Sequence, residues 1–165
     1  MIEQAITFFL KHIPVFCFIG GVIGAFVSKR EPSPARRWLA WTVLAIGVDG
    51  LWAGFFHVFF PGIASAQIGW QPSPFEFEIG VADLAMGTVA VVAFWRSASF
   101  QSAIALYTIL FYLGVAIGHF NQAFVHHDFA SDNFGLLLAI TIIRIVLLSF
   151  LIWAVWREPK SGGRE

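Results

Sequence analysis

The chain has 165 residues, of which 58% are hydrophobic and only 12% charged, and its formal net charge at neutral pH is zero. Soluble domains carry about 25% charged residues, so this composition predicts an integral membrane protein. The balanced charge argues against nucleic acid as a partner. The single cysteine, Cys17, excludes a disulfide within these residues and any paired-cysteine redox or zinc motif.

Five long apolar runs follow one another along the chain. Each is at least as long as the roughly 20 residues that a helix needs to cross the hydrocarbon core. Strands of a membrane barrel would instead alternate over about 10 residues. The sequence therefore predicts an all-α fold with a single domain, a bundle of five transmembrane helices. Their predicted ranges are about 6–27, 38–60, 75–95, 102–125 and 134–156.

The distribution of Lys and Arg predicts the orientation of this bundle. The loop 28–37, the short third-to-fourth connection at Arg96, and the tail residues Arg157, Lys160 and Arg164 carry eight of the ten basic residues. The opposite side carries only Lys11. Because cytoplasmic loops are enriched in Lys and Arg, we expect the amino terminus outside and the carboxyl terminus inside. The first helix lacks the features of a cleaved signal peptide, so we expect a multi-pass protein of the bacterial inner membrane.

Three charged residues fall at one depth inside the predicted helices. Counted from the basic end of each helix at about 1.5 Å per residue, Asp49, Asp83 and Arg144 all lie roughly 17 Å deep, near the middle of the core. An unpaired charge at this depth costs several kcal/mol. We therefore expect Arg144 to bridge the two carboxylates. This cluster serves either as a clamp between helices or as a proton or ion pathway.

A second polar layer is predicted closer to the outer face. The same count places His57, Glu78 and His119 within one helical turn of each other, at depths of roughly 26 to 29 Å. Two imidazoles and a carboxylate form a plausible first shell for a divalent transition metal such as zinc, iron, copper or manganese. Haem ligation by the two histidines is a less favoured interpretation. In the simplest alternative the histidines only hydrogen-bond to their neighbours.

Two further groups of polar residues need an interpretation. In the predicted outer loop, His126, His127 and Asp128 form either an access site for a metal or a solvated turn. In the third helix, Glu76 and Asp83 are seven residues apart and face together, whereas Glu78 points about 160° away from Glu76. Glu76 is predicted to be solvated near the headgroups.

Glycines recur at helical spacing in four of the five predicted helices. Gly20 with Gly24, and Gly114 with Gly118, fit the GxxxG pattern that lets helices approach closely in lipid. We expect these faces to pack within the bundle. The alternative is association of two copies of the chain into a homo-oligomer.

Residues 74–84, PFEFEIGVADL, followed by Gly87, resemble a motif of one membrane protein family. The motif is a Pro-Phe, then Glu-Val/Ile-Gly, then Ala-Asn/Asp-Leu and a glycine. It belongs to a family of small polytopic bacterial membrane proteins of unknown function. The resemblance implies that Glu78, Gly80 and Asp83 are shared positions, with Asp83 standing where the family often has asparagine. It implies no activity.

The leading hypothesis is a buried metal or metallo-cofactor site near the outer face, formed by His57, Glu78 and His119. A redox role would follow from a redox-active metal, but the residues predict a ligand set rather than a reaction. The alternative is a small proton-coupled transporter or channel that uses Asp49 and Asp83 with Arg144. A third hypothesis is a non-catalytic accessory subunit. The lipid bilayer is the one partner that the sequence predicts directly.

Overall fold

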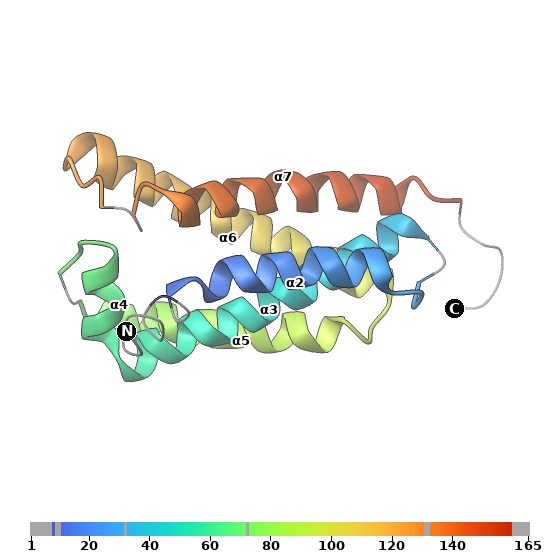
Figure 1. Ribbon diagram of the computed structural model, residues 1–165, viewed down its shortest axis with the longest axis horizontal. Helices are drawn as coiled ribbons and strands as arrows, with labels where there is room; N and C mark the ends of the chain where they lie inside the picture. Colours follow the sequence, from blue (N-terminus) through green and yellow to red (C-terminus); the bar gives the residue numbers. More distant parts are fainter. Residues whose placement is uncertain (1–7, 9–10, 32, 72, 131–132, 160–165) are drawn as a thin grey trace.

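The structure, a computed structural model, describes residues 8, 11–31, 33–71, 73–130 and 133–159 (Figure 1). Every regular element in these residues is a helix, which confirms the predicted all-α class. The helices are α2 (Ile13–Val27), α3 (Pro34–Phe59), α4 (Pro61–Gln67), α5 (Phe75–Ala93), α6 (Ala98–Val125) and α7 (Leu136–Trp156). The start of the first predicted helix at residue 6, and the tail residues Lys160 and Arg164, lie outside the described residues.

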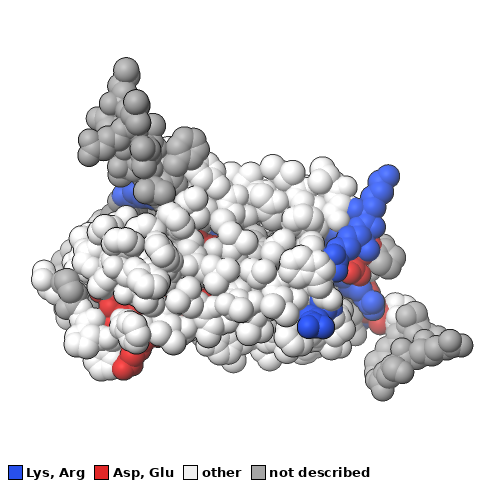
Figure 2. Space-filling model, turned by 90° about the horizontal axis from the view of Figure 1, so that it is seen from below, with Lys and Arg blue, Asp and Glu red and all other residues white. Residues whose placement is uncertain are grey.

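The long helices have the character of membrane spans. By length and composition, α3, α6 and α7 could each cross a membrane. Helix α2 is a shorter apolar helix, and α5 carries three carboxylates in its 19 residues. These five helices run side by side along the long axis of the molecule (Figure 1). On the face seen in Figure 2, most Lys and Arg side chains gather at one end, the middle of the molecule shows only small acidic patches, and a larger acidic patch lies at the opposite end.

Two of these helices begin earlier than the hydropathy pattern predicts. The Ser33 side chain accepts a hydrogen bond from the backbone N–H of Arg36, and Pro34 occupies the first turn of α3. Both features are typical of helix starts. Ser97 caps α6 in the same way. Arg36 and Arg37 therefore belong to the first turn of α3 rather than to a loop. The long connection after α3 also contains a short helix, α4, that the pattern did not reveal.

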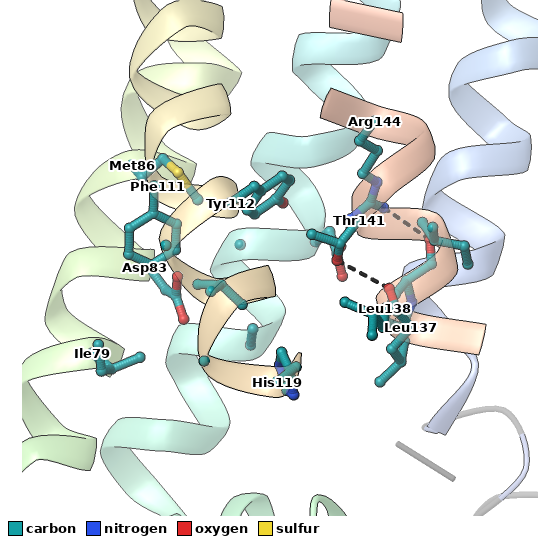
Figure 3. A pocket seen from close by; sticks show the side chains of 18 of the residues that line it. Ile79, Asp83, Met86, Phe111, Tyr112, His119, Leu137, Leu138, Thr141 and Arg144 are labelled. Atoms are coloured by element: carbon teal, nitrogen blue, oxygen red, sulfur yellow. Dashed lines mark hydrogen bonds and ion pairs between the residues drawn. The ribbon is translucent and has the colours of Figure 1, made fainter. Parts of the chain in front are cut away.

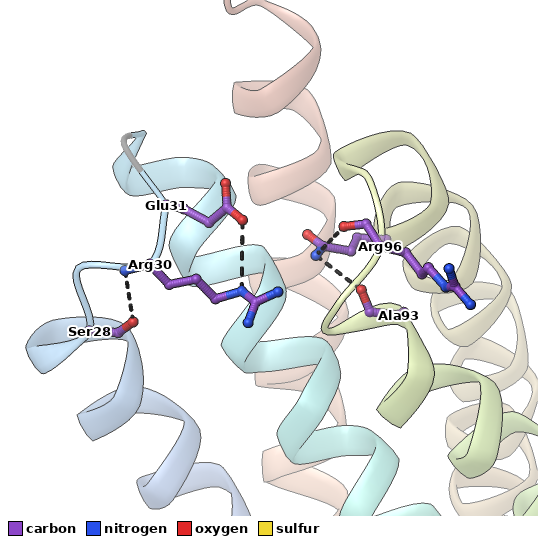
Figure 4. A network of polar contacts seen from close by, with 6 residues as sticks. Ser28, Arg30, Glu31, Ala93 and Arg96 are labelled. Atoms are coloured by element: carbon purple, nitrogen blue, oxygen red, sulfur yellow. Dashed lines mark hydrogen bonds and ion pairs between the residues drawn. The ribbon is translucent and has the colours of Figure 1, made fainter. Parts of the chain in front are cut away.

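The connections at the end of the molecule rich in Lys and Arg, here called the basic end, are held by polar contacts (Figure 4). Gln101, which is 2% exposed, donates from Nε2 to the carbonyl oxygens of Ala93 at 3.1 Å and Arg96 at 3.2 Å. The guanidinium of Arg30 lies 3.9 Å from the Glu31 carboxylate. Since buried carbonyls need donors, Gln101 completes the turn between α5 and α6.

Helices α3 and α5 are in backbone contact along a row of glycines. A Cβ atom added to Gly47 would lie 2.8 Å from the backbone nitrogen of Val91, and one added to Gly87 would lie 2.7 Å from that of Leu51. Neither position has room for a side chain. The close approach is the kind that small residues permit between membrane helices. The pair therefore forms one closely packed unit, and α2 packs against its α3 side.

The four other predicted packing glycines behave differently from one another. A Cβ on Gly24 would overlap the Trp41 ring, so this glycine does allow α2 to approach α3. Gly20, Gly114 and Gly118 have no atom within 4 Å of an added Cβ. Among the described residues, the 114–118 pair is therefore not a helix contact.

The core is concentrated toward the basic end. Buried apolar side chains from α3, α5, α6 and α7 form one cluster there, centred on Leu39, Met86, Ala105 and Leu148. Toward the opposite end, where α4 lies, α6 diverges from α5 while staying beside α7 (Figure 1). We call this the α4 end. Because α6 diverges from α5 there, a cavity lies between the pair α3 and α5 and the pair α6 and α7.

Candidate functional site

The cavity has a volume of about 650 Å³ and is bounded by all five long helices and residues 68–70. Most of its walls are apolar, but several polar side chains reach it (Figure 3). A largely apolar cavity of about 300–1,000 Å³ with a few convergent polar groups is typical of small-molecule sites. The cavity is therefore the candidate functional site.

A buried ion pair lies on the wall formed by α3 and α7. The Arg144 guanidinium donates from Nη1 to Oδ2 of Asp49 at 2.5 Å and from Nη2 to the carbonyl oxygen of Pro14 at 3.1 Å. Arg144 is 3% exposed and Asp49 7%. The Tyr112 hydroxyl lies beside the same guanidinium (Figure 3). These contacts join α2, α3, α6 and α7 at one level, while Nε of Arg144 is buried without a hydrogen-bond partner in the described part of the chain.

Asp83 lines the same cavity from α5 (Figure 3). It is 8% exposed, and its backbone lies against Gly50, next to Asp49 on α3. Arg144 was expected to bridge both carboxylates, yet in the structure it forms an ion pair with Asp49 only. Among the described residues, no side chain donates a hydrogen bond to Asp83. The cavity thus holds one paired carboxylate and one without a cationic partner.

The structure does not bring the three predicted metal ligands together. Glu78 is exposed on α5, whereas Glu76, predicted to be solvated, is 9% exposed. Nδ1 of His57 lies 3.4 Å from Oε1 of Glu76. The helical phase of α5 explains why Glu76 rather than Glu78 is buried. Glu76, Gly80 and Asp83 share one face of the helix. That face lies against His57, because an added Cβ on Gly80 would lie 2.9 Å from Cβ of His57.

His119 lies at the α4 end of the cavity, away from Glu78. Its Nδ1 donates to Oδ1 of Asn133 at 2.6 Å, and Nδ2 of Asn133 donates to the carbonyl oxygen of Asp128 at 2.7 Å. The Trp70 ring lies 5.8 Å from the His119 ring, centroid to centroid. His119 is therefore held by the segment before α7 and faces Trp70. Asn133 is fully buried, and no sequence motif singles it out.

The predicted access site is not assembled as a cluster. His126 and His127 are exposed, and His127 adopts a positive φ of 58° at the end of α6. Asp128 accepts from the backbone N–H of Ala130 at 3.0 Å and lies against Gly69. In the part of the chain that the structure describes, no group of three or more His, Cys, Asp or Glu residues is placed to hold a metal ion.

Comparison with known proteins adds one finding. Residues 11–161 match a family of unknown function (DUF6790). The chain belongs to this family. No curated protein and no solved structure matches the chain. Membership of an uncharacterised family, which the motif at residues 74–84 predicts, is confirmed at that level. DUF6790 brings no activity with it, so a function has to be argued from the cavity.

Proposed function

We propose that the chain crosses the cytoplasmic membrane of a bacterium five times, with its amino terminus outside and its basic end inside. The bias of Lys and Arg toward one end supports this orientation. Helix α5, with 19 residues, extends about 28 Å, which is close to the thickness of the hydrocarbon core. In this orientation the cavity occupies the outer half of the membrane.

Within this arrangement the protein is a proton-coupled carrier of a small amphipathic molecule. The main support for this proposal is that Asp49, Asp83 and Arg144 all line one cavity in the middle of an apolar bundle. Ionisable groups within membrane helices are costly and mark substrate or proton pathways. A clamp needs only the Asp49–Arg144 pair and gives no reason for a second buried carboxyl group beside a cavity.

The packed core at the basic end closes the cavity toward the cytoplasm in this conformation. A carrier must also open on the cytoplasmic side, by moving one group of helices against another. The glycine contact between α3 and α5 makes those two helices one rigid body. Helices α6 and α7 form the second body, and the cavity lies between the two, where an alternating motion would act on it.

Thiol labelling tests this proposal, because Cys17 is the only cysteine in the chain. In a Cys17→Ser background, Thr141→Cys places a thiol on the cavity wall. Val146→Cys is the matched control, since Val146 lies on the same helix and is 64% exposed toward lipid. We expect the impermeant cationic reagent MTSET to modify Thr141→Cys from outside, and more slowly from inside, while Val146→Cys stays unmodified.

Modification from both sides is the signature of a carrier, and modification from outside alone indicates a binding site without transport. If Thr141→Cys stays as unmodified as Val146→Cys in folded protein, no water-filled cavity exists. Mass spectrometry of the intact protein measures the modified fraction directly.

Metal binding is the second candidate function, favoured by the contact between His57 and Glu76. Nδ1 of His57 and Oε1 of Glu76 are both buried, and neither has a hydrogen-bond partner among the described residues. A neutral imidazole and a carboxylate are common zinc and iron ligands. The cavity that His57 lines leaves room for water as the remaining ligands.

Elemental analysis separates the two candidates. Metal binding predicts about one zinc, iron, copper or manganese ion per chain in protein purified without chelator, and loss of that ion in His57→Ala and Glu76→Gln. A Soret band would indicate haem. The carrier proposal expects metal far below one ion per chain and unchanged metal content in both variants.

A further inference from the structure

We infer that the cavity takes a lipid-soluble organic cation, which enters from the bilayer between α5 and α6 and pairs with Asp83. This inference rests on the proposed function and names its substrate class. Three observations support it: the charge of the cavity, the aromatic side chains on its walls, and the exposure of the residues at one side.

When Asp83 is ionised, the buried charges of the cavity do not cancel. Arg144 is committed to Asp49 and to the Pro14 carbonyl, so its charge is compensated. Asp83 then remains as one carboxyl group that forms no ion pair among the described side chains, and the charge that acts on it is that of Asp49, of the same sign. A buried carboxylate needs a partner of opposite charge. A cationic ligand supplies that partner, whereas an anionic ligand would add a further negative charge.

Aromatic side chains line the same cavity as the carboxyl group. Trp70, Phe111 and Tyr112 all reach it, and Figure 3 draws Phe111 next to Asp83. Aromatic faces attract cations, and the attraction is stronger where water is excluded. An organic cation would therefore be held by its charge at Asp83 and by its apolar groups against the rings.

One side of the cavity opens toward lipid. Ile79 on α5 and Leu110 and Gly114 on α6 line the cavity, and all three are exposed. An added Cβ on Gly114 or Gly118 would meet no atom within 4 Å. The wall between α5 and α6 is thus incomplete at the level where α6 diverges. A molecule dissolved in the bilayer can reach Asp83 through this opening without passing through water.

Binding of a cation at Asp83 is coupled to release of a proton. Without ligand, the proton on the Asp83 carboxyl group balances its charge; with ligand, the cation takes its place and the proton leaves to solvent. The other titratable groups that face the cavity already have partners. Asp49 pairs with Arg144, His57 lies against Glu76, His119 donates to Asn133, and Tyr112 lies beside Arg144.

The test uses three probes of different charge: tetraphenylphosphonium, tetraphenylborate of nearly the same size, and the smaller neutral triphenylphosphine oxide. Binding to the full chain in nanodiscs is measured by calorimetry. We expect the phosphonium to bind, and Asp83→Asn, which keeps the shape of the side chain, to weaken its binding roughly tenfold or more. Asp83→Glu, which keeps the carboxyl group, should bind the phosphonium with most of the affinity of the parent chain.

The rate of phosphonium association tests the path from the bilayer between α5 and α6. Gly114→Phe should slow phosphonium association roughly tenfold, because the ring fills the opening. Ile117→Phe, on a lipid-facing position of α6, is the matched control and should leave the rate unchanged. An unchanged rate in Gly114→Phe overturns the path.

The outcomes separate this inference from the proposed function. Equal phosphonium binding by Asp83→Asn and the parent chain overturns the role of Asp83. Binding of the borate or of the neutral oxide in place of the phosphonium overturns the cationic class and leaves a cavity that binds small molecules. Binding of none of the three probes, with thiol labelling showing no cavity, overturns both.

Discussion

Replacing Arg144 with methionine is expected to lower the free energy of unfolding by about 3–5 kcal/mol. The guanidinium is 3% exposed and joins Asp49 on α3 to the Pro14 carbonyl on α2. Its removal leaves the Asp49 carboxylate buried without a cation. Unfolding by a denaturing detergent, followed by tryptophan fluorescence, measures the change. Arg96→Met is the control, because Arg96 is exposed and its loss should have little effect.

The double variant Arg144→Met with Asp49→Leu should recover most of this loss. Replacing both members of a buried ion pair with apolar side chains is often neutral or stabilising by about 1–4 kcal/mol. If the pair is only a clamp, the recovered protein keeps every other property. If the pair belongs to a carrier, the recovered protein folds but no longer transports. A double variant as unstable as Arg144→Met would show that the stability comes from packing and not from charge.

Depth along the helices was predictable from the sequence. A helix rises about 1.5 Å per residue whatever its side chains, so counting from the basic end gives the position of a residue along the helix axis. That count placed Asp49, Asp83 and Arg144 at one level, and the structure has all three on one cavity. The restriction of the ion pair to Asp49 depends on how α5 is rotated, which depth does not determine.

Rotation is where the sequence interpretation and the structure differ. Adjacent helix positions are about 100° apart, so an offset of two residues turns a side chain from the core to the lipid. The depth count favoured Glu78, whereas the structure buries Glu76 beside His57. The signal was present: Glu76, Gly80, Asp83 and Gly87 fall at i, i+4, i+7 and i+11, which is one face of a helix. The two glycines mark that face as the one that contacts α3.

The cavity could not be predicted from the sequence. The GxxxG pattern of Gly114 and Gly118 predicts a close helix contact, but both glycines face open space at the point where α6 leaves α5. The same absence of side chains permits either close packing or a cavity. Which one results depends on the angle between helices, and that angle is set by contacts elsewhere. The large buried side chains at the basic end hold α6 against α5 only over its first half.

Replacing Asn133 with leucine is expected to destabilise the α4 end of the molecule by about 2–4 kcal/mol, since two partly buried polar groups lose their partners. The Asn133 side chain is fully buried and joins two elements. Its oxygen accepts from His119, and its amide donates to the Asp128 carbonyl oxygen. Leucine has a similar volume, so the loss would report hydrogen bonding rather than a void.

Hydrogen exchange measures this effect locally. The backbone N–H of Asp128 donates to the Gln122 carbonyl oxygen and that of Ala130 to the Asp128 carboxylate, so both amides report opening of this segment. Both should exchange faster in Asn133→Leu, while α3 and α5 stay protected. Ser149→Ala, which removes a hydroxyl bonded only within α7, is the matched control. Uniformly faster exchange along the whole chain would contradict a local role. Because His119 lines the cavity, its release should also weaken phosphonium binding without changing the charge at Asp83, which separates positioning from pairing.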